Sequence, residues 1–219
     1  MVTGFADRVE VIRRRIADLV EDHGSELVAA YYAPRSGFAG AMFDQFGDNP
    51  DDRFTADDFV AASLLDVRFG PASVEALLVE HAGDRWLAEI PNDPSTALWT
   101  TALHPKSAPW KLWNFLTEIE DVGPTRASKL LARKRPHLMP ILDSVITKSL
   151  SLGHGDRWKT LSEVLDKPTR DALAGLSEAA DGAAPSILRL LDVLTWMRSS
   201  ESERARDVRR GLGFKVEER

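Results

Sequence analysis

Residues 120–146 read EDVGPTRASKLLARKRPHLMPILDSVI, and this stretch indicates the fold more specifically than any other part of the chain. It opens with a tight turn, because Gly123 tolerates a positive φ angle and Pro124 has the backbone angle of a first helical residue. Apolar residues at helical spacing follow, which predicts a helix that begins at the turn. Farther along, Asp143 stands alone inside the apolar run ILDSVI.

The helix predicted after the turn has two distinct faces. Its apolar face consists of Ala127, Leu130 and Leu131. Basic residues separated by three and four positions fall on another face. These residues are Arg126, Lys129 and Arg133, and Lys134 and Arg135 come directly after them.

A second predicted helix precedes the turn, with an apolar stripe made of Leu112, Phe115, Leu116 and Ile119. Two helices joined by such a short turn form a helix-hairpin-helix arrangement. The first amides of the second helix lack intrahelical acceptors and lie at the positive end of the helix dipole, so together they attract an anion. The hairpin therefore predicts a site that binds a phosphate of a nucleic acid without contacting any base.

Helical periodicity dominates the rest of the chain as well. A stripe near the N-terminus consists of Phe5, Val9, Ile12, Ile16 and Leu19, and one near the C-terminus consists of Ile187, Leu190, Leu191 and Leu194. Thr55 with Asp58 is typical of a capping box, and Pro71 is typical of a first helical position. The expected fold is all-α, a helical bundle that contains the helix-hairpin-helix.

Loops suggest how the chain is divided. Residues 33–52 form a long loop rich in Gly, Asp and Pro, and a proline-marked link runs through residues 90–99. We therefore expect an N-terminal helical region over 1–98 and a helix-hairpin-helix block over 99–200. Residues 201–219 are polar all round, which predicts a charged extension of the last helix. All three regions are also compatible with one domain.

Composition narrows the functional classes. The 219 residues include no cysteine, which excludes disulfides, iron–sulfur clusters and a thiol nucleophile. No apolar run reaches the roughly 20 residues of a membrane span, and the first residues lack a signal core, so we expect a cytoplasmic protein without membrane contact. The formal charge is −6, yet residues 101–160 hold ten Lys or Arg against five Asp or Glu. This basic island indicates one surface that faces a polyanion.

Residues 119–127 and 142–146 resemble the helix-hairpin-helix DNA glycosylases. Members of that superfamily carry a hairpin of the form L-P-G-V-G-x-[KS]-[ST]-A and, later, V-D-[ST]-H-V with a catalytic aspartate. Here the two elements read IEDVGPTRA and LDSVI, and Asp143 lies twenty residues after Gly123, which is the spacing of the family. The resemblance covers about 30 residues. Two other stretches, DDFVAASLL (57–65) and LLARKRPHLMPILDS (130–144), look like an uncharacterised bacterial domain family.

Three departures from the glycosylase pattern bear on its chemistry. Members that also cut the backbone place a Schiff-base lysine two residues after the second glycine, where this chain has Thr125. The resemblance therefore implies a monofunctional enzyme that removes a base without lyase chemistry. Asp121 replaces the first hairpin glycine and brings a negative charge near the expected phosphate, and Val145 replaces the family's histidine.

Asp143 has two interpretations that are compatible with each other. Loss of a base gives the sugar oxocarbenium character, which a fixed carboxylate stabilises while it orients water. Alternatively, Asp143 is the N-cap of a helix that starts in LDSVITKSL, because aspartate is a preferred cap.

The remaining candidate residues have similar pairs of interpretations. Trp110, Trp113 and Trp158 are candidates for a wall or wedge around a flipped base, or they belong to the core. The candidates for DNA contact are Val122, Gly123, Pro124, Thr125, Arg126, Lys129, Arg133, Lys134, Arg135 and Lys148. The cations among them would make binding strongly salt-dependent, or they form a solvated helix end.

The sequence thus predicts a DNA-binding protein that is a candidate DNA glycosylase for a damaged or modified base. One alternative is a non-enzymatic DNA-binding protein with the same fold. Another is a protein-interaction module whose acidic N-terminal half and charged C-terminal helix engage a partner. No spacing of histidines and acids predicts a metal site, and no cofactor is expected beyond the monovalent cation that the resemblance implies at the hairpin carbonyls.

Overall fold

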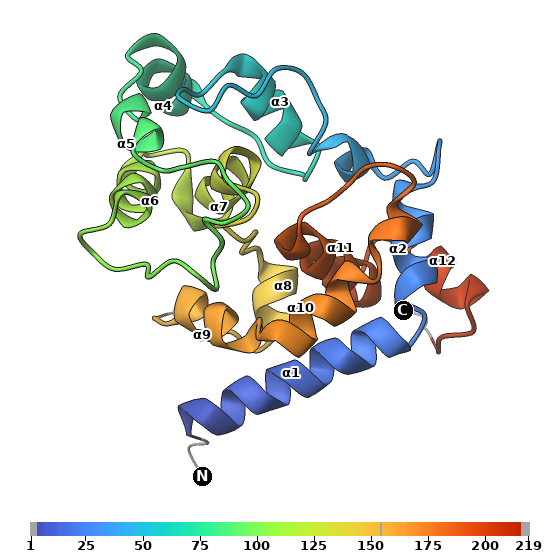
Figure 1. Cartoon of the computed structure of the whole chain (residues 1–219). Coiled ribbons are helices and arrows are strands. Elements are labelled where there is room, and N and C mark those ends of the chain that lie inside the picture. Colours follow the sequence, from blue (N-terminus) through green and yellow to red (C-terminus); the bar gives the residue numbers. More distant parts are fainter. Residues whose placement is uncertain (1–3, 154, 216–219) are drawn as a thin grey trace. The chain divides into compact units, whose positions relative to one another are not determined.

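The computed structural model describes residues 4–153 and 155–215, and all regular structure within these ranges is helical (Figure 1). This confirms the all-α prediction. None of the described helices is both long enough and apolar enough to cross a bilayer. The chain forms two compact units: a central unit, Ala39–Asp143, and a terminal unit, Met1–Phe38 with Ser144–Arg219.

The central unit is built around two adjacent helices that pack against each other, α6 (Ala108–Glu118) and α7 (Gly123–Lys134). Its other elements are η1 (Ala39–Met42), α3 (Ala56–Ser63), α4 (Pro71–Val74), the π-helical turn η2 (Glu75–Val79) and α5 (Asp84–Ala88). The predicted apolar faces form its core: Leu112, Leu116, Ala127, Leu130 and Leu131 are all buried.

Both predicted helix starts in this unit are confirmed. The Thr55 amide donates to Asp58 Oδ2 at 2.8 Å, and the Asp58 amide donates back to Thr55 Oγ1 at 3.4 Å, which is the capping box of α3. Pro71 is the first residue of α4. Each device satisfies or removes an amide donor that the first helical turn leaves unpaired.

The terminal unit combines both ends of the chain. Its helices are α1 (Phe5–Glu21), α2 (Gly24–Tyr32), α8 (Ser144–Ser149), α9 (Arg157–Val164), α10 (Lys167–Ala174), η3 (Ser177–Ala180), α11 (Ile187–Ser199) and α12 (Glu203–Gly211). The α1 stripe is buried at Val9, Ile12, Ile16 and Leu19. It is buried because α1 packs on α9, α10 and α11, helices that come more than a hundred residues later in the sequence.

The boundaries of the two units follow Phe38 and Asp143. They differ from the boundaries of the expected regions 1–98, 99–200 and 201–219. The C-terminal segment also differs from the expected extension of the last helix. α11 ends at Ser199, and α12 begins after Ser202, whose hydroxyl accepts the Ala205 amide at 3.2 Å. α12 packs on α11 and buries the guanidinium of Arg209, which donates to the Met197 and Ser200 carbonyls. The expected tail over 216–219 lies outside the described residues.

Candidate nucleic-acid interface

Four residues, Ile119–Val122, connect α6 to α7, and the connection closes through a hydrogen bond from the Val122 amide to the Ile119 carbonyl at 3.0 Å. Gly123 then opens α7 with φ +60°. A Cβ atom at this position would meet no other atom within 4 Å. Glycine is therefore favoured here by its backbone conformation, and the space in front of the turn is open.

The N-terminus of α7 has the donors that the sequence predicted. Pro124 has no amide hydrogen, and within the described residues no acceptor outside α7 bonds the amides of Gly123, Thr125 or Arg126. Pro124 is exposed, and Thr125 and Arg126 are partly exposed. α7 has 12 residues, so these amides lie at the positive end of a substantial helix dipole. The arrangement can accept a single anionic group.

Asp121 is turned toward another helix. Its carboxylate accepts the Ser73 amide at 3.1 and 3.3 Å and so caps α4. Gly70 makes this possible, because a Cβ atom there would lie 2.4 Å from Asp121 Oδ2. On the other side of the turn, Arg126 Nε donates to the Arg68 carbonyl. Residues 68–73 therefore brace the α6–α7 connection at two points.

Four of the six predicted phosphate-binding cations are buried: Lys129 (5% exposed), Arg133 (3%), Lys134 (0%) and Arg135 (2%). Lys129 Nζ donates to the Leu65 carbonyl at 2.6 Å. Arg133 donates to the Phe43 carbonyl at 2.8 Å and to the Phe46 carbonyl. These side chains tie α7 to the backbone of residues 43–65.

Lys134 and Arg135 complete the set. Lys134 Nζ lies 2.5 Å from Asp58 Oδ2 and also donates to Asn49 Oδ1 and the Pro50 carbonyl, at 3.0 and 3.1 Å. The four acceptors of the Arg135 guanidinium are the carbonyls of Asp51, Leu87, Ile90 and Lys134. Burial lowers the pKa of both side chains, most strongly through lost hydration; Asp58 opposes this effect at Lys134, and Asp51 opposes it at Arg135.

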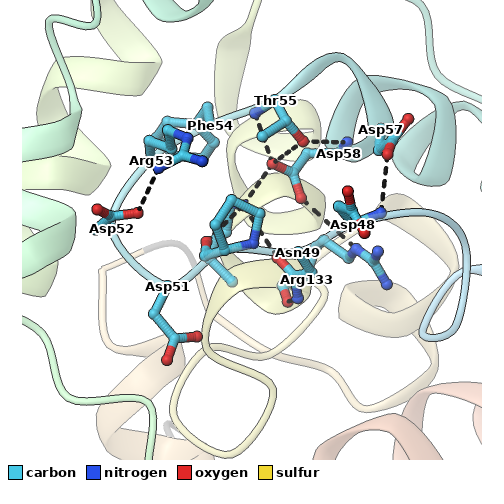
Figure 2. Close-up of polar contacts among 12 residues, drawn as sticks. Asp48, Asn49, Asp51, Asp52, Arg53, Phe54, Thr55, Asp57, Asp58 and Arg133 are labelled. Atoms are coloured by element: carbon cyan, nitrogen blue, oxygen red, sulfur yellow. Dashed lines mark hydrogen bonds and ion pairs between the residues drawn. The ribbon is translucent and has the colours of Figure 1, made fainter.

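Figure 2 shows how Asp58 takes part in this cluster. Its carboxylate lies between Thr55, whose amide it accepts, and Arg133, whose Nε is 3.6 Å from Oδ1. Asp58 is completely buried, so a single carboxylate both caps α3 and balances part of the charge of Arg133 and Lys134. The cluster fixes the loop of residues 43–55, whose role the sequence left uninterpreted.

Three cations of the basic island, Lys148, Arg157 and Lys159, belong to the terminal unit, and four of its other seven are buried inside the central unit. This unit contains ten Lys or Arg and sixteen Asp or Glu, so it carries the whole formal charge of −6. Four of those cations and one of those carboxylates are buried. The other six cations and fifteen carboxylates give the remainder of the unit a formal charge of −9, which opposes a polyanion.

Sequence reasoning missed this burial, although one signal was present. Arg133, Lys134 and Arg135 are consecutive, and three consecutive helical residues spread over about 200° of the helix circumference. They cannot share one solvent-facing side of a helix whose neighbouring residues, Leu130 and Leu131, are in the core.

Asp143 keeps both of its interpretations. Its side chain is 16% exposed, and Oδ2 lies 3.9 Å from Lys129 Nζ, so a buried ammonium on α7 helps to fix the carboxylate. It also immediately precedes α8, in the N-cap position. The first geometry permits contact with a ligand, and the second explains an aspartate here without one.

The structure brings together some of the other candidates and separates others. Trp110 and Trp113 lie on α6, partly exposed, in the same unit as the turn and Asp143. Trp158 and Lys148 belong to the terminal unit, where Trp158 is buried at 8% exposure and Lys148 is exposed on α8. Trp158 therefore has the burial of a core residue.

An open depression of about 570 Å³ lies beside the buried cluster, lined by Asp48, Asn49, Pro50, Arg53, Thr55, Ala56 and Asp57. One of its acids is used to hold the loop on α3, since Asp57 Oδ2 accepts the backbone amide of Asp48 at 2.8 Å (Figure 2). No group of three or more His, Asp or Glu side chains in the described part of the chain is arranged to hold a metal ion.

Comparison with known proteins identifies the family. The chain belongs to a family of unknown function, DUF6308, whose model matches residues 25–199. This confirms the likeness of residues 57–65 and 130–144 to an uncharacterised domain family. No curated protein and no solved structure matches the chain.

Proposed function

We propose that α6, Ile119–Val122 and α7 form a helix-hairpin-helix that holds one phosphate of a DNA backbone. The observation that carries this proposal is the set of amides at Gly123, Thr125 and Arg126, which have no acceptor outside α7 among the described residues and face an open turn. Amides at a helix N-terminus bind phosphate without any lysine or arginine. A monovalent cation on the carbonyls of the connection belongs to the same proposal.

The buried cations support the proposal indirectly. They hold α7 against residues 43–65 and 87–90 through backbone carbonyls, so the helix N-terminus is presented on a rigid support. A preorganised donor set loses little conformational entropy when it binds. Because the surrounding surface is acidic, the expected contact is local, with one phosphate.

The test is the affinity for an undamaged DNA duplex, near physiological salt, of wild type and of Thr125→Glu. The new carboxylate competes with a phosphate for the α7 amides, while helix N-termini tolerate glutamate well, so folding should be preserved. We expect the affinity to fall about tenfold or more, on the scale of 1.4 kcal/mol for one charge-assisted contact.

Asn114→Glu is the matched control, because it adds the same charge at an exposed position of α6. The control should lose much less affinity than Thr125→Glu. Equal losses would show a general charge effect, and no measurable binding by the wild type would reject the DNA proposal in favour of a protein-interaction module, which the acidic surface also suits.

Base excision is a second candidate function, favoured by the position of Asp143. In this reaction water adds to the sugar C1′ as the base leaves, and the sugar passes through a state with oxocarbenium character. A carboxylate that is 16% exposed and 3.9 Å from the Lys129 ammonium is fixed in place and still accessible to such a sugar. Thr125 supplies no amine for a Schiff base, so strand cleavage is not part of this proposal.

Asp143→Asn separates excision from simple binding. We expect wild type to prefer a duplex with a stable abasic-site analogue whose sugar ring carries a positive charge over an intact duplex. The variant should lose most of that preference, because asparagine cannot stabilise the positive charge. Glu120→Gln is the control, since it removes an exposed carboxylate beside the hairpin. Equal binding of both duplexes by wild type would leave only the non-enzymatic, backbone-binding function.

A further inference from the structure

One side of the terminal unit carries cations that have few acidic partners. Arg8 and Arg15 lie on α1, Lys148 on α8 and Lys159 on α9. We call these four residues the basic face. Asp156 is the only carboxylate that lies within 4.0 Å of any of them in the described part of the chain, where it pairs with Arg8. Of the other acids of α1, Asp7 accepts the Gly4 amide and Glu10 pairs with Arg13 and Arg14, whereas Asp18, three residues after Arg15, is exposed. On α9, Glu163 is exposed four residues after Lys159.

Hydrogen bonds and cation–π contacts hold the basic face together. Arg15 Nη1 donates to the Ser149 carbonyl, next to Lys148, and to Ser151 Oγ at 3.1 Å. The ring of Phe5 lies beneath both Arg8 and Lys159, at 5.3 and 4.8 Å from its centroid. α9 lies beside the N-terminal half of α1 (Figure 1), and Arg15 reaches the backbone of Ser149 at the end of α8, so the four residues come from neighbouring elements of one unit.

The length of the basic face suits a nucleic-acid strand. Arg8 and Arg15 are seven residues apart on α1, which corresponds to about 10 Å along the helix axis. One strand of B-DNA places a phosphate about every 3.4 Å along its axis, so the face spans about three phosphates. Lys148 and Lys159 are exposed, so both side chains can contact a ligand without breaking any contact of the core.

We infer that the basic face is a second contact for the phosphate backbone of DNA. This inference rests on the proposed function and adds to it the charged surface that the hairpin lacks. The central unit buries four of its ten cations, and its remaining charged residues are mainly acidic. The amides at the N-terminus of α7 therefore have no long-range electrostatic attraction to assist them. On the terminal unit, Arg15, Lys148 and Lys159 have no ion pair within 4.0 Å among the described residues and are at least partly exposed, so they supply local attraction for phosphates.

The experiment measures binding of an undamaged fluorescent duplex at several salt concentrations by wild type and by Lys148→Gln/Lys159→Gln. Neither substitution removes a buried contact, and the Arg8 and Arg15 contacts remain in place. The control is Lys167→Gln/Lys215→Gln, which removes the same charge from exposed positions of the same unit. The double variant should bind several-fold more weakly, and the slope of log K against log salt should become shallower by about 1 to 2.

The outcomes separate this inference from the proposed function. If Lys148→Gln/Lys159→Gln binds like wild type, or if the control loses as much affinity, the basic face is not a DNA contact. If Thr125→Glu weakens binding and the lysine variant does not, the hairpin acts alone. If the lysine variant weakens binding and Thr125→Glu does not, the basic face binds DNA and the hairpin proposal fails. If neither variant changes the affinity for DNA, both the hairpin proposal and the basic-face inference are rejected.

Discussion

At the scale of single residues, the most informative pair is Lys134 and Asp58. Both side chains are completely buried, and their charged atoms are 2.5 Å apart. Burial of an ion pair costs hydration on both sides, so the pair itself contributes little net stability. Removal of one partner is different, because the other charge stays in the interior without compensation.

Lys134→Met should therefore lower the free energy of unfolding by about 3–5 kcal/mol, since it leaves Asp58 buried beside Arg133 alone. Urea-induced unfolding measures this loss. Lys111→Met, at an exposed position of α6, should change stability by about 0.5 kcal/mol or less.

Asp58→Asn/Lys134→Met tests the physical reason. Asparagine keeps an oxygen for the Thr55 amide and carries no charge, so the double variant should be more stable than the sum of the single losses, by about 0.5–3 kcal/mol. Strict additivity would contradict the view that the cost comes from an uncompensated charge.

At the scale of elements, local signals predicted helices well. The α1 stripe, the Thr55–Asp58 box and the Gly123-Pro124 turn are decided by residues at most a few positions apart, and the structure has all three. The burial of the α7 cations depends instead on hydrogen bonds to carbonyls of residues 43–65 and 87–90. Those residues are far away in the sequence, so local patterns do not predict the burial. The same holds for Asp121, whose partner Ser73 is 48 positions away.

Gly70→Ala tests the brace between α4 and the α6–α7 connection. Gly70 has an extended backbone, φ −106° and ψ −171°, which alanine adopts without strain. Its Cβ atom would nevertheless lie 2.4 Å from Asp121 Oδ2, so the carboxylate must leave the Ser73 amide. We expect a loss of about 1–3 kcal/mol in urea-induced unfolding, the cost of an unsatisfied amide and a displaced charge.

Gly211→Ala is the matched control, because a Cβ atom there meets nothing within 4 Å. It should leave stability unchanged or raise it slightly. Asp121→Ala removes the carboxylate that clashes with the new Cβ atom of Gly70→Ala. Asp121→Ala should therefore lower the free energy of unfolding less in the Gly70→Ala background than in wild type. Independent effects would show that Gly70 and Asp121 do not interact.

At the scale of the whole molecule, charge is divided unequally between the two units. The central unit carries the entire formal charge of −6, and the residues of the terminal unit sum to zero. The basic island of residues 101–160 did not reveal this division, because a linear count does not distinguish a buried lysine from an exposed one. Seven of the ten cations of that island belong to the central unit, where four of them are buried and the other charged residues are mainly acidic.

This division predicts the salt dependence of DNA binding. If all six predicted cations neutralised phosphates, log K would fall against log salt with a slope of about −5. Of that set, only Arg126 and Lys148 are at least partly exposed, and amides release no counterions. Arg126 together with a basic face that spans about three phosphates gives an expected slope between about −1 and −4. Binding isotherms at four or more salt concentrations measure it. A slope near −5 would mean that Lys129, Arg133, Lys134 and Arg135 leave their carbonyl partners when DNA binds, and that the central unit reorganises around its ligand.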